Sequence, residues 1–150
     1  MRTKFFFDLG VEDLKNKLII LDIDGTLTHD RLAKLEDKTV AKVQELKKHN
    51  EIYLCSNRNN HDRNKQVAKE VGVEYLHTNI RKPRKGIMAL VPNHEGKDLL
   101  VIGDKFLTDG LFARRIGGKF IKVKRIASPN DRLTTRTINW IDDLISKFFK

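Results

Sequence analysis

Five short aliphatic runs recur along the chain. They lie at residues 18–23, 52–56, 73–76, 99–103 and 119–123, and most of them are bounded by polar residues or glycine. Continuous apolar runs of this length are typical of strands that are buried on both faces of a sheet. The pattern therefore predicts five buried strands.

Between these runs, apolar residues recur at the spacing of a helix. Asp37 is a candidate N-cap for the first of these segments. Strands that alternate with helices predict an α/β fold of βαβ units, with a mostly parallel sheet and helices on both faces. The apolar positions that predict four helices are Val40, Val43 and Leu46; Val67, Ala68 and Val71; Ile87, Leu90 and Val91; and Leu111, Phe112 and Ile116.

The end of the chain, residues 134–150, has the pattern of an amphipathic helix. Ile141, Leu144, Ile145 and Phe148 follow helical spacing, with Trp140 and Phe149 beside them. We expect the stripe to pack on the domain. Trp140, Phe149 and the phenylalanines at 5–7 remain candidate contacts with a membrane interface.

The length of 150 residues predicts one domain over residues 1–150, with a short N-terminal segment at 1–16. Cys55 is the only cysteine, which excludes a disulfide within the chain and a cysteine-based metal cluster and favours a reducing compartment. No run approaches the ~20 apolar residues of a membrane span, and the N-terminus lacks the pattern of a signal peptide. We expect a cytoplasmic protein, either soluble or peripheral on the inner face of the membrane.

The formal net charge of +10 changes the expected partners. A field of this sign attracts phosphate-rich partners such as nucleic acid or an anionic membrane. A basic protein without such a partner has the same composition, so charge alone does not choose between them.

Acidic and hydroxyl side chains follow three of the predicted strands. Asp22 and Asp24 come at the end of the first strand, Ser56 ends the second, and Asp104 follows the fourth. In parallel sheets, ligands bind beyond the carboxyl ends of the strands. A capped turn would explain the Asp-x-Asp-Gly pair alone. Such a turn does not explain why Asp104 and Asp109 follow a separate strand. We therefore expect a ligand-binding site at this edge of the sheet.

These residues resemble the four motifs of the haloacid dehalogenase superfamily of phosphatases. The matching segments are DIDGT at 22–26, Ser56 after a strand, RKP at 81–83 and GDKFLTD at 103–109, in the order and spacing of that family. The resemblance covers nearly the whole chain. It implies a single Rossmann-like domain with a sheet ordered 5-4-1-2-3, and a Mg²⁺-dependent phosphatase with an aspartate nucleophile.

The resemblance also implies a role for each acidic residue. Asp22 is the nucleophile that forms an aspartyl-phosphate, and Asp24 is the acid and base that protonates the leaving oxygen and activates water. The predicted Mg²⁺ ligands are Asp22, Asp104 and the main-chain carbonyl of Asp24, because hard oxygen atoms suit this ion. Asp109 is expected to orient metal-bound water or Lys82 rather than to bind the metal directly.

The phosphate group is predicted to be bound by a second set of residues. Ser56 and the amide of Asn57 bind the phosphate oxygens, and Gly25 and Thr26 complete the group by shaping the loop after the nucleophile. Lys82 is the catalytic cation that balances Asp22 and phosphate.

A solvated basic loop is the ordinary interpretation of the RKPRK segment at 81–85. We prefer Lys82 to Arg84 and Lys85 because Pro83 completes the Lys-Pro form of the motif.

Motif spacing leaves no room for the cap domain that many members of this superfamily insert. Only 31 residues separate Asp24 from Ser56, and 25 separate Ser56 from Lys82. An open site is expected to act on a large or surface-held substrate, or to borrow a wall from another subunit in an oligomer.

The chain resembles the capless branch that contains the phosphatidylglycerophosphate phosphatases in the segments LCSNRNN, RKP, VIGDKFLTDGLFARRIGG and the closing TRTINWIDDLI. The expected substrate is therefore a lipid head group at an anionic membrane surface. Gly25 departs from this branch, which usually has Asn there. DIDGTLT is closer to capless sugar-phosphate phosphatases of the 3-deoxy-manno-octulosonate 8-phosphate type. Polynucleotide 3'-phosphatases are another capless group that the chain resembles, and a catalytically silent membrane- or nucleic-acid-binding module is the non-enzyme alternative.

Overall fold

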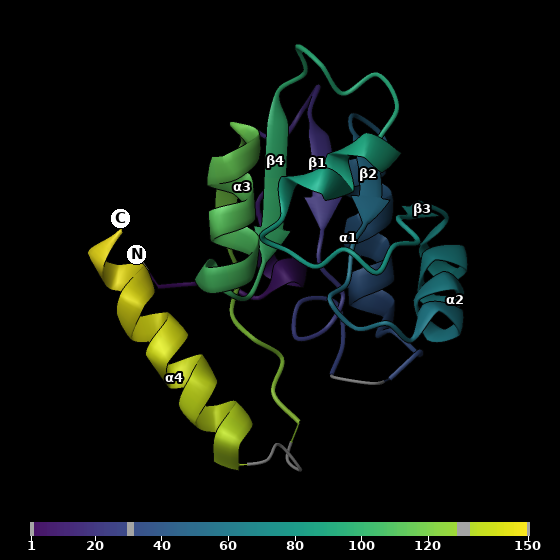
Figure 1. Ribbon diagram of the computed structural model, residues 1–150. Helices are drawn as coiled ribbons and strands as arrows, with labels where there is room; N and C mark the ends of the chain where they lie inside the picture. The colour runs from purple at the N-terminus through teal and green to yellow at the C-terminus, as the bar shows by residue number, and fades with distance from the viewer. Residues whose placement is uncertain (1, 30–31, 129–132, 150) are drawn as a thin grey trace.

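The computed structural model describes residues 2–29, 32–128 and 133–149, which fold around one five-stranded sheet (Figure 1). The order β3-β2-β1-β4-β5 confirms the predicted topology, and every neighbouring pair of strands is parallel. The strands are β1 Leu18–Leu21, β2 Glu51–Leu54, β3 Glu74–Tyr75, β4 Leu99–Gly103 and β5 Lys119–Lys122.

Helices cover both faces of the sheet, as the apolar pattern predicts. The helices that pack on the two faces are α1 Asp37–Lys47, α2 His61–Val71 and the 3-10 helix η1 Phe6–Asp8 on one face, and α3 Leu111–Ile116 and the 3-10 helix η2 Lys85–Leu90 on the other. The π-helix η3 Phe106–Gly110 follows β4, and helix α4 Leu133–Phe148 follows β5.

The central strand β1 alternates its side chains between two hydrophobic clusters. Ile19 and Leu21 pack with η1, α1 and α2 on one face, whereas Leu18 and Ile20 pack with η2 and α3 on the other. All four side chains are buried. Burial on both faces explains why the strand appears in the sequence as a continuous apolar run rather than an alternating one.

Two expectations about helices are wrong in detail. The third segment is the 3-10 helix η2 rather than an α-helix: it contains Gly86, which disfavours a helix interior, and Pro92 follows soon after its end. Asp37 is the first residue of α1, and the cap position belongs to Glu36, whose side chain makes no capping bond.

The strands β1 and β2 end two residues earlier than predicted, at Leu21 and Leu54. The chain leaves the sheet there and turns into loops that carry the polar residues of the motifs.

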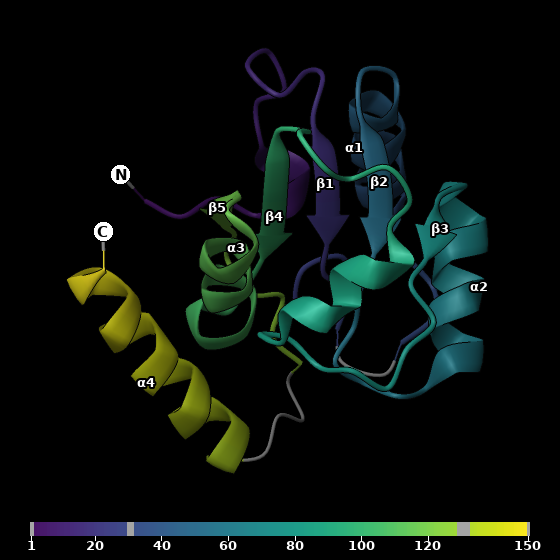
Figure 2. The same cartoon turned by 45° about the horizontal axis from the view of Figure 1, so that its top comes forward.

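Helix α4 lies outside the helices that cover the two faces of the sheet and contacts η3 (Figures 1 and 2). It begins one residue before the predicted range, and Lys150 lies outside the described residues. The expectation that its apolar stripe packs on the domain is wrong, because Ile141, Leu144 and Phe148 are exposed while Asp142 is buried. Within the described residues, no helix has the length and apolar character needed to cross a bilayer.

Candidate active site

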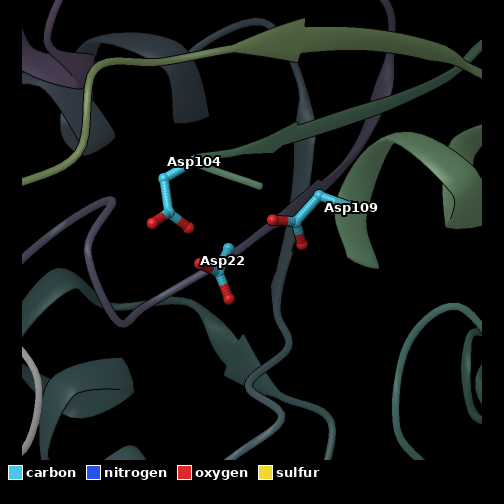
Figure 3. A group of neighbouring side chains, drawn as sticks. All are labelled: Asp22, Asp104 and Asp109. Carbon is cyan, nitrogen blue, oxygen red and sulfur yellow. The ribbon is translucent and has the colours of Figure 1, made fainter. Parts of the chain in front are cut away.

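Three carboxylates meet at the carboxyl edge of the sheet. Asp22 follows β1, Asp104 follows β4, and Asp109 lies in η3; one oxygen atom from each lies within 4.8 Å of the others (Figure 3). The register explains the approach of the first two, because Leu21 pairs with Ile102 in adjacent strands. All three residues are buried, so this edge holds more negative charge than a folded interior ordinarily tolerates.

Lys82 is the main counter-charge. Its Nζ atom donates to Asp22 Oδ1 at 2.8 Å and to Asp109 Oδ1 at 2.5 Å, and its side chain is only 2% exposed. The other oxygen of Asp22 accepts a hydrogen bond from the hydroxyl of Thr26 at 3.1 Å. The predicted nucleophile is therefore held on both oxygens, one by a cation and one by a neutral donor.

Asn57 positions the loop that carries Lys82. Its Oδ1 accepts from the backbone N–H of Lys82 at 2.7 Å, and its Nδ2 donates to the carbonyl of Lys82 at 3.0 Å. This two-bond clamp ties the loop after β2 to the RKP segment, and the intervening Lys82–Pro83 peptide is cis.

Burial dominates the electrostatics of the cluster. It raises the pKa of Asp109 to about 6, against the opposing effect of Lys82. Burial, Asp22 and Asp109 together raise the pKa of Asp104 well above its ordinary value. Burial opposes the charge on Lys82, but Asp109 and Asp22 outweigh it and raise the pKa of this ammonium group. The site thus keeps Lys82 protonated, and its carboxylates favour the binding of a further positive charge, either a proton or a metal ion.

Asp24 lies apart from this cluster and contacts a different set of donors. Arg63 binds it with one guanidinium nitrogen, 2.7 Å from Oδ1 and 2.8 Å from Oδ2. The hydroxyl of Ser56 donates to Asp24 Oδ2 at 2.9 Å, and Arg58 Nε lies 3.7 Å from Oδ1. The predicted acid and base is held at the pocket by Arg63, Ser56 and Arg58.

The donors of the loop after the nucleophile already have partners within the protein. Gly25 has φ +79° and donates its N–H to Thr28 O at 2.8 Å, which closes a tight turn. A Cβ at Gly25 would lie 2.8 Å from Arg125 and closer to Asp104. The hydroxyl of Thr26 is engaged by Asp22. The predicted contacts of Gly25 and Thr26 with phosphate therefore stay a prediction, as does that of Ser56.

Sequence reasoning missed two arginines of this site. Arg125 binds Asp104 Oδ2 at 2.8 Å, and Arg63 binds Asp24. Both left a signal in the sequence. Arg125 follows the fifth strand, at the same sheet edge as the acidic residues. Arg63 lies four positions before Val67 and thus on the apolar face of α2, where a charged residue needs a buried partner.

Asp22, Asp24 and Asp104 line a pocket of about 170 Å³. Its lining combines three of the predicted acidic residues with basic and amide side chains, which suits an anionic group carried with a cation. The lining residues are Asp22, Asp24, Asn57, Arg58, Lys82, Asp104, Lys105, Thr108 and Arg125.

The donor set fits Mg²⁺. Asp22, Asp104 and Asp109 present closely spaced hard oxygen atoms, and the raised pKa values of Asp104 and Asp109 mark charge that a cation would compensate. Lys82 and the backbone N–H of Lys105 occupy the two oxygens of Asp109, at 2.5 and 3.3 Å. Asp22 and Asp104 line the pocket and Asp109 does not, which favours the first two as ligands and agrees with a supporting role for Asp109.

Comparison with known proteins gives the same class of protein. Residues 6–126 match the family described as mitochondrial PGP phosphatase. A relative from Bacillus subtilis (strain 168), named probable phosphatase YqeG, is 33% identical over 139 residues, which cover 88% of this chain and 80% of the relative. No solved structure matches the chain. The chain therefore belongs to the mitochondrial PGP phosphatase family and is a phosphatase of the haloacid dehalogenase type.

Proposed function

We propose that the protein is a Mg²⁺-dependent phosphomonoester hydrolase that works through an aspartyl-phosphate on Asp22. The observation that carries the proposal is the setting of Asp22, which lines the pocket, lies beside Asp104 and is held by Lys82 and Thr26. These contacts fix the carboxylate in one orientation, which lowers the entropic cost of bringing it in line with phosphorus.

In the proposed first step, a carboxylate oxygen of Asp22 attacks phosphorus, and the bond to the leaving oxygen breaks. Asp24, protonated in the complex with substrate, donates its proton to that oxygen and becomes a carboxylate, so the product leaves as an alcohol. In the second step Asp24 removes a proton from water, whose oxygen attacks phosphorus. The bond to Asp22 then breaks and inorganic phosphate leaves, so Asp22 is again a carboxylate and Asp24 is again protonated.

Charge balance at the pocket supports this chemistry. A phosphate monoester dianion would enter a pocket lined by Arg58, Lys105 and Arg125 as well as Lys82, which offset its repulsion from the carboxylates. Mg²⁺, when held by Asp22 and Asp104, would supply Lewis-acid stabilisation of the charge on the phosphoryl oxygens.

We propose phosphatidylglycerophosphate as the substrate. The description of the matching family, the net charge of +10 and the short segments between the motifs support it. Between Asp24 and Ser56 the described residues contain α1 and β2, without an inserted domain to enclose a small metabolite. A basic protein with an open site can reach a phosphate that stands above an anionic bilayer. The proposed location is cytoplasmic, at the inner face of the membrane.

The backbone at Gly25 suits both glycine and the Asn that is usual in the phosphatidylglycerophosphate branch. At φ +79° the position requires a residue that tolerates the left-handed region. Glycine and asparagine are the two residues that adopt it most readily. The backbone therefore does not separate the two residues, but the packing does: a Cβ at this position would lie 2.8 Å from Arg125 and closer to Asp104, so these side chains would have to shift to admit Asn.

Phosphate release at matched substrate concentrations tests the proposal. We expect faster hydrolysis of phosphatidylglycerophosphate in anionic vesicles than of 3-deoxy-manno-octulosonate 8-phosphate or a 3'-phosphorylated oligonucleotide. Asp22→Asn is the control for contaminating phosphatase. If either soluble substrate is hydrolysed about tenfold faster, a factor equal to about 1.4 kcal/mol in the barrier, the lipid assignment is wrong and the mechanism on Asp22 stands.

A further inference from the structure

Helix α4 attaches to the domain through its polar side. Asp142 is 2% exposed, and its two carboxylate oxygens accept the backbone N–H groups of Phe106 and Leu107 at 2.8 and 2.7 Å. Lys122 reaches the same helix, 3.0 Å from Asp142 and 2.8 Å from Asp143. Charged and hydrogen-bonding groups thus hold α4 on the domain, whereas most surface helices are held by an apolar face.

The apolar side of α4 is left facing outward. Trp140 is 65% exposed and Phe148 80%, and Leu144 between them is also exposed. A helix of a protein in water ordinarily turns this stripe toward its own core. Contiguous exposed apolar patches mark surfaces that bind something. The exposed apolar residues of the helix are Leu133, Ile138, Trp140, Ile141, Leu144 and Phe148.

We propose that this apolar face of α4 binds the surface of an anionic bilayer. The helix has 16 residues and is about 24 Å long, a length that suits lying in the interface plane. Trp140 is a residue type that prefers the level of the lipid head groups. Arg136 and Lys147, both exposed, lie three helical turns apart and therefore on the same side of the helix, beside Trp140.

Charge complementarity favours a bilayer over a second copy of the chain. Each copy has a formal net charge of +10, so pairing two copies brings like charges together. An anionic bilayer attracts the same charge, with about 1 kcal/mol contributed by each Lys or Arg near its surface.

A groove connects the helix to the catalytic pocket. The cavity between α4, η3, β5 and the N-terminal segment has a volume of about 1080 Å³, and Asp104, Lys105 and Arg125 line both it and the catalytic pocket. Phe149, whose ring stacks on Phe106 at 5.2 Å, lies in the lining at the end of α4. Binding of α4 to a bilayer does not depend on the proposed function.

Trp140 is the only tryptophan of the chain and reports directly on the proposed contact. Full-length Asp22→Asn protein, which cannot form the proposed phosphoenzyme, is mixed with vesicles of phosphatidylcholine alone or with phosphatidylglycerol. We expect a blue shift of tryptophan emission and quenching by brominated acyl chains in the phosphatidylglycerol vesicles only, with both effects weakened by salt.

The test variant is Leu144→Gln with Phe148→Gln, and the matched control is Ile80→Gln with Leu90→Gln, two exposed apolar residues away from α4. We expect the test variant to raise the dissociation constant for the vesicles at least about tenfold, while the control variant binds as the parent protein does. Circular dichroism and hydrolysis of a soluble aryl phosphate, measured with Asp22 intact, should be the same for the test variant and the unsubstituted protein.

Three results would overturn the proposal. They are an emission spectrum that vesicles do not change, equal binding by the test and control variants, and a blue shift that depends on protein concentration without lipid. The last would assign the face to self-association. A failure of phosphatidylglycerophosphate hydrolysis would refute the proposed function alone, because the binding assay uses no substrate.

Discussion

The carboxylates of the active site make the stability of the protein depend on pH and Mg²⁺ together. Burial raises the pKa of Asp109 from its ordinary value of 3.8 to about 6. The folded protein therefore takes up this proton more readily than the unfolded chain does. The associated stability is fully present below pH ~4 and is lost as the pH rises through about 6. We predict this loss when Mg²⁺ is removed by a chelator.

The size of the effect follows from the shift. Two pKa units correspond to about 3 kcal/mol, of which about 1 kcal/mol is lost between pH ~5 and pH ~7. Asp104, whose pKa is also raised, adds to the loss in the same direction. Lys82 stays protonated throughout, because Asp109 and Asp22 raise its pKa despite its burial. Bound Mg²⁺ supplies the positive charge that the carboxyl groups lose when they release their protons, so the stabilisation by Mg²⁺ should grow with pH.

Urea unfolding followed by circular dichroism, with chelator or with saturating Mg²⁺ at each pH, measures the difference in free energy of unfolding. The Asp109→Asn variant lacks one of the two titrating carboxyl groups and should lose part of the pH dependence in chelator, while Asp104 accounts for the rest. Asp104→Asn should weaken the Mg²⁺ effect at every pH. Equal pH slopes with and without Mg²⁺, or an unchanged slope in Asp109→Asn, would refute the reasoning.

Three further predictions concern single side chains. Asp22→Asn should keep the fold and abolish Mg²⁺-dependent hydrolysis of an aryl phosphate, and substantial turnover would exclude Asp22 as the nucleophile. Arg63→Met should cost about 3 kcal/mol in unfolding free energy, because Asp24 keeps a mostly buried charge. The kcat of Arg63→Met should fall at least about tenfold as Asp24 loses its orientation, and that of Arg63→Lys should be intermediate. Wild-type values in Arg63→Met would contradict the proposal that Arg63 orients Asp24. Asp142→Ala leaves two backbone donors of η3 unpaired, at a cost of about 1–3 kcal/mol each. Hydrogen exchange at Phe106 and Leu107 should become faster, and unchanged exchange would show that the contact is dispensable.

The sheet and the acidic edge of the site could be predicted from the sequence because both depend on local patterns. Strands buried on both faces must be apolar throughout, so β1 and β4 stand out as continuous runs. Parallel strands place their carboxyl ends at one edge, so the pattern predicts that Asp22 and Asp104 share that edge. The strand order implied by the family resemblance makes their strands neighbours, and the two carboxylates do lie together.

The partners of those carboxylates were decided by tertiary structure. Arg63 meets Asp24 across 39 positions of sequence, and Lys82 meets Asp22 across 60. No local pattern specifies such pairs, because each depends on how a helix or loop is placed against the sheet. The RKP motif pointed to Lys82, whereas Arg63 had only its position on the apolar face of α2 as a signal.

Helix α4 shows most clearly what the sequence determined by itself and what it did not. Its periodicity determined that residues near 134–150 form an amphipathic helix, and the structure has α4 at Leu133–Phe148. Periodicity cannot say which side of a helix meets the domain. That was decided by the first two residues of η3, whose backbone N–H groups need acceptors and find them in Asp142. Satisfying these buried donors turns the polar side of α4 inward and leaves its apolar side outward.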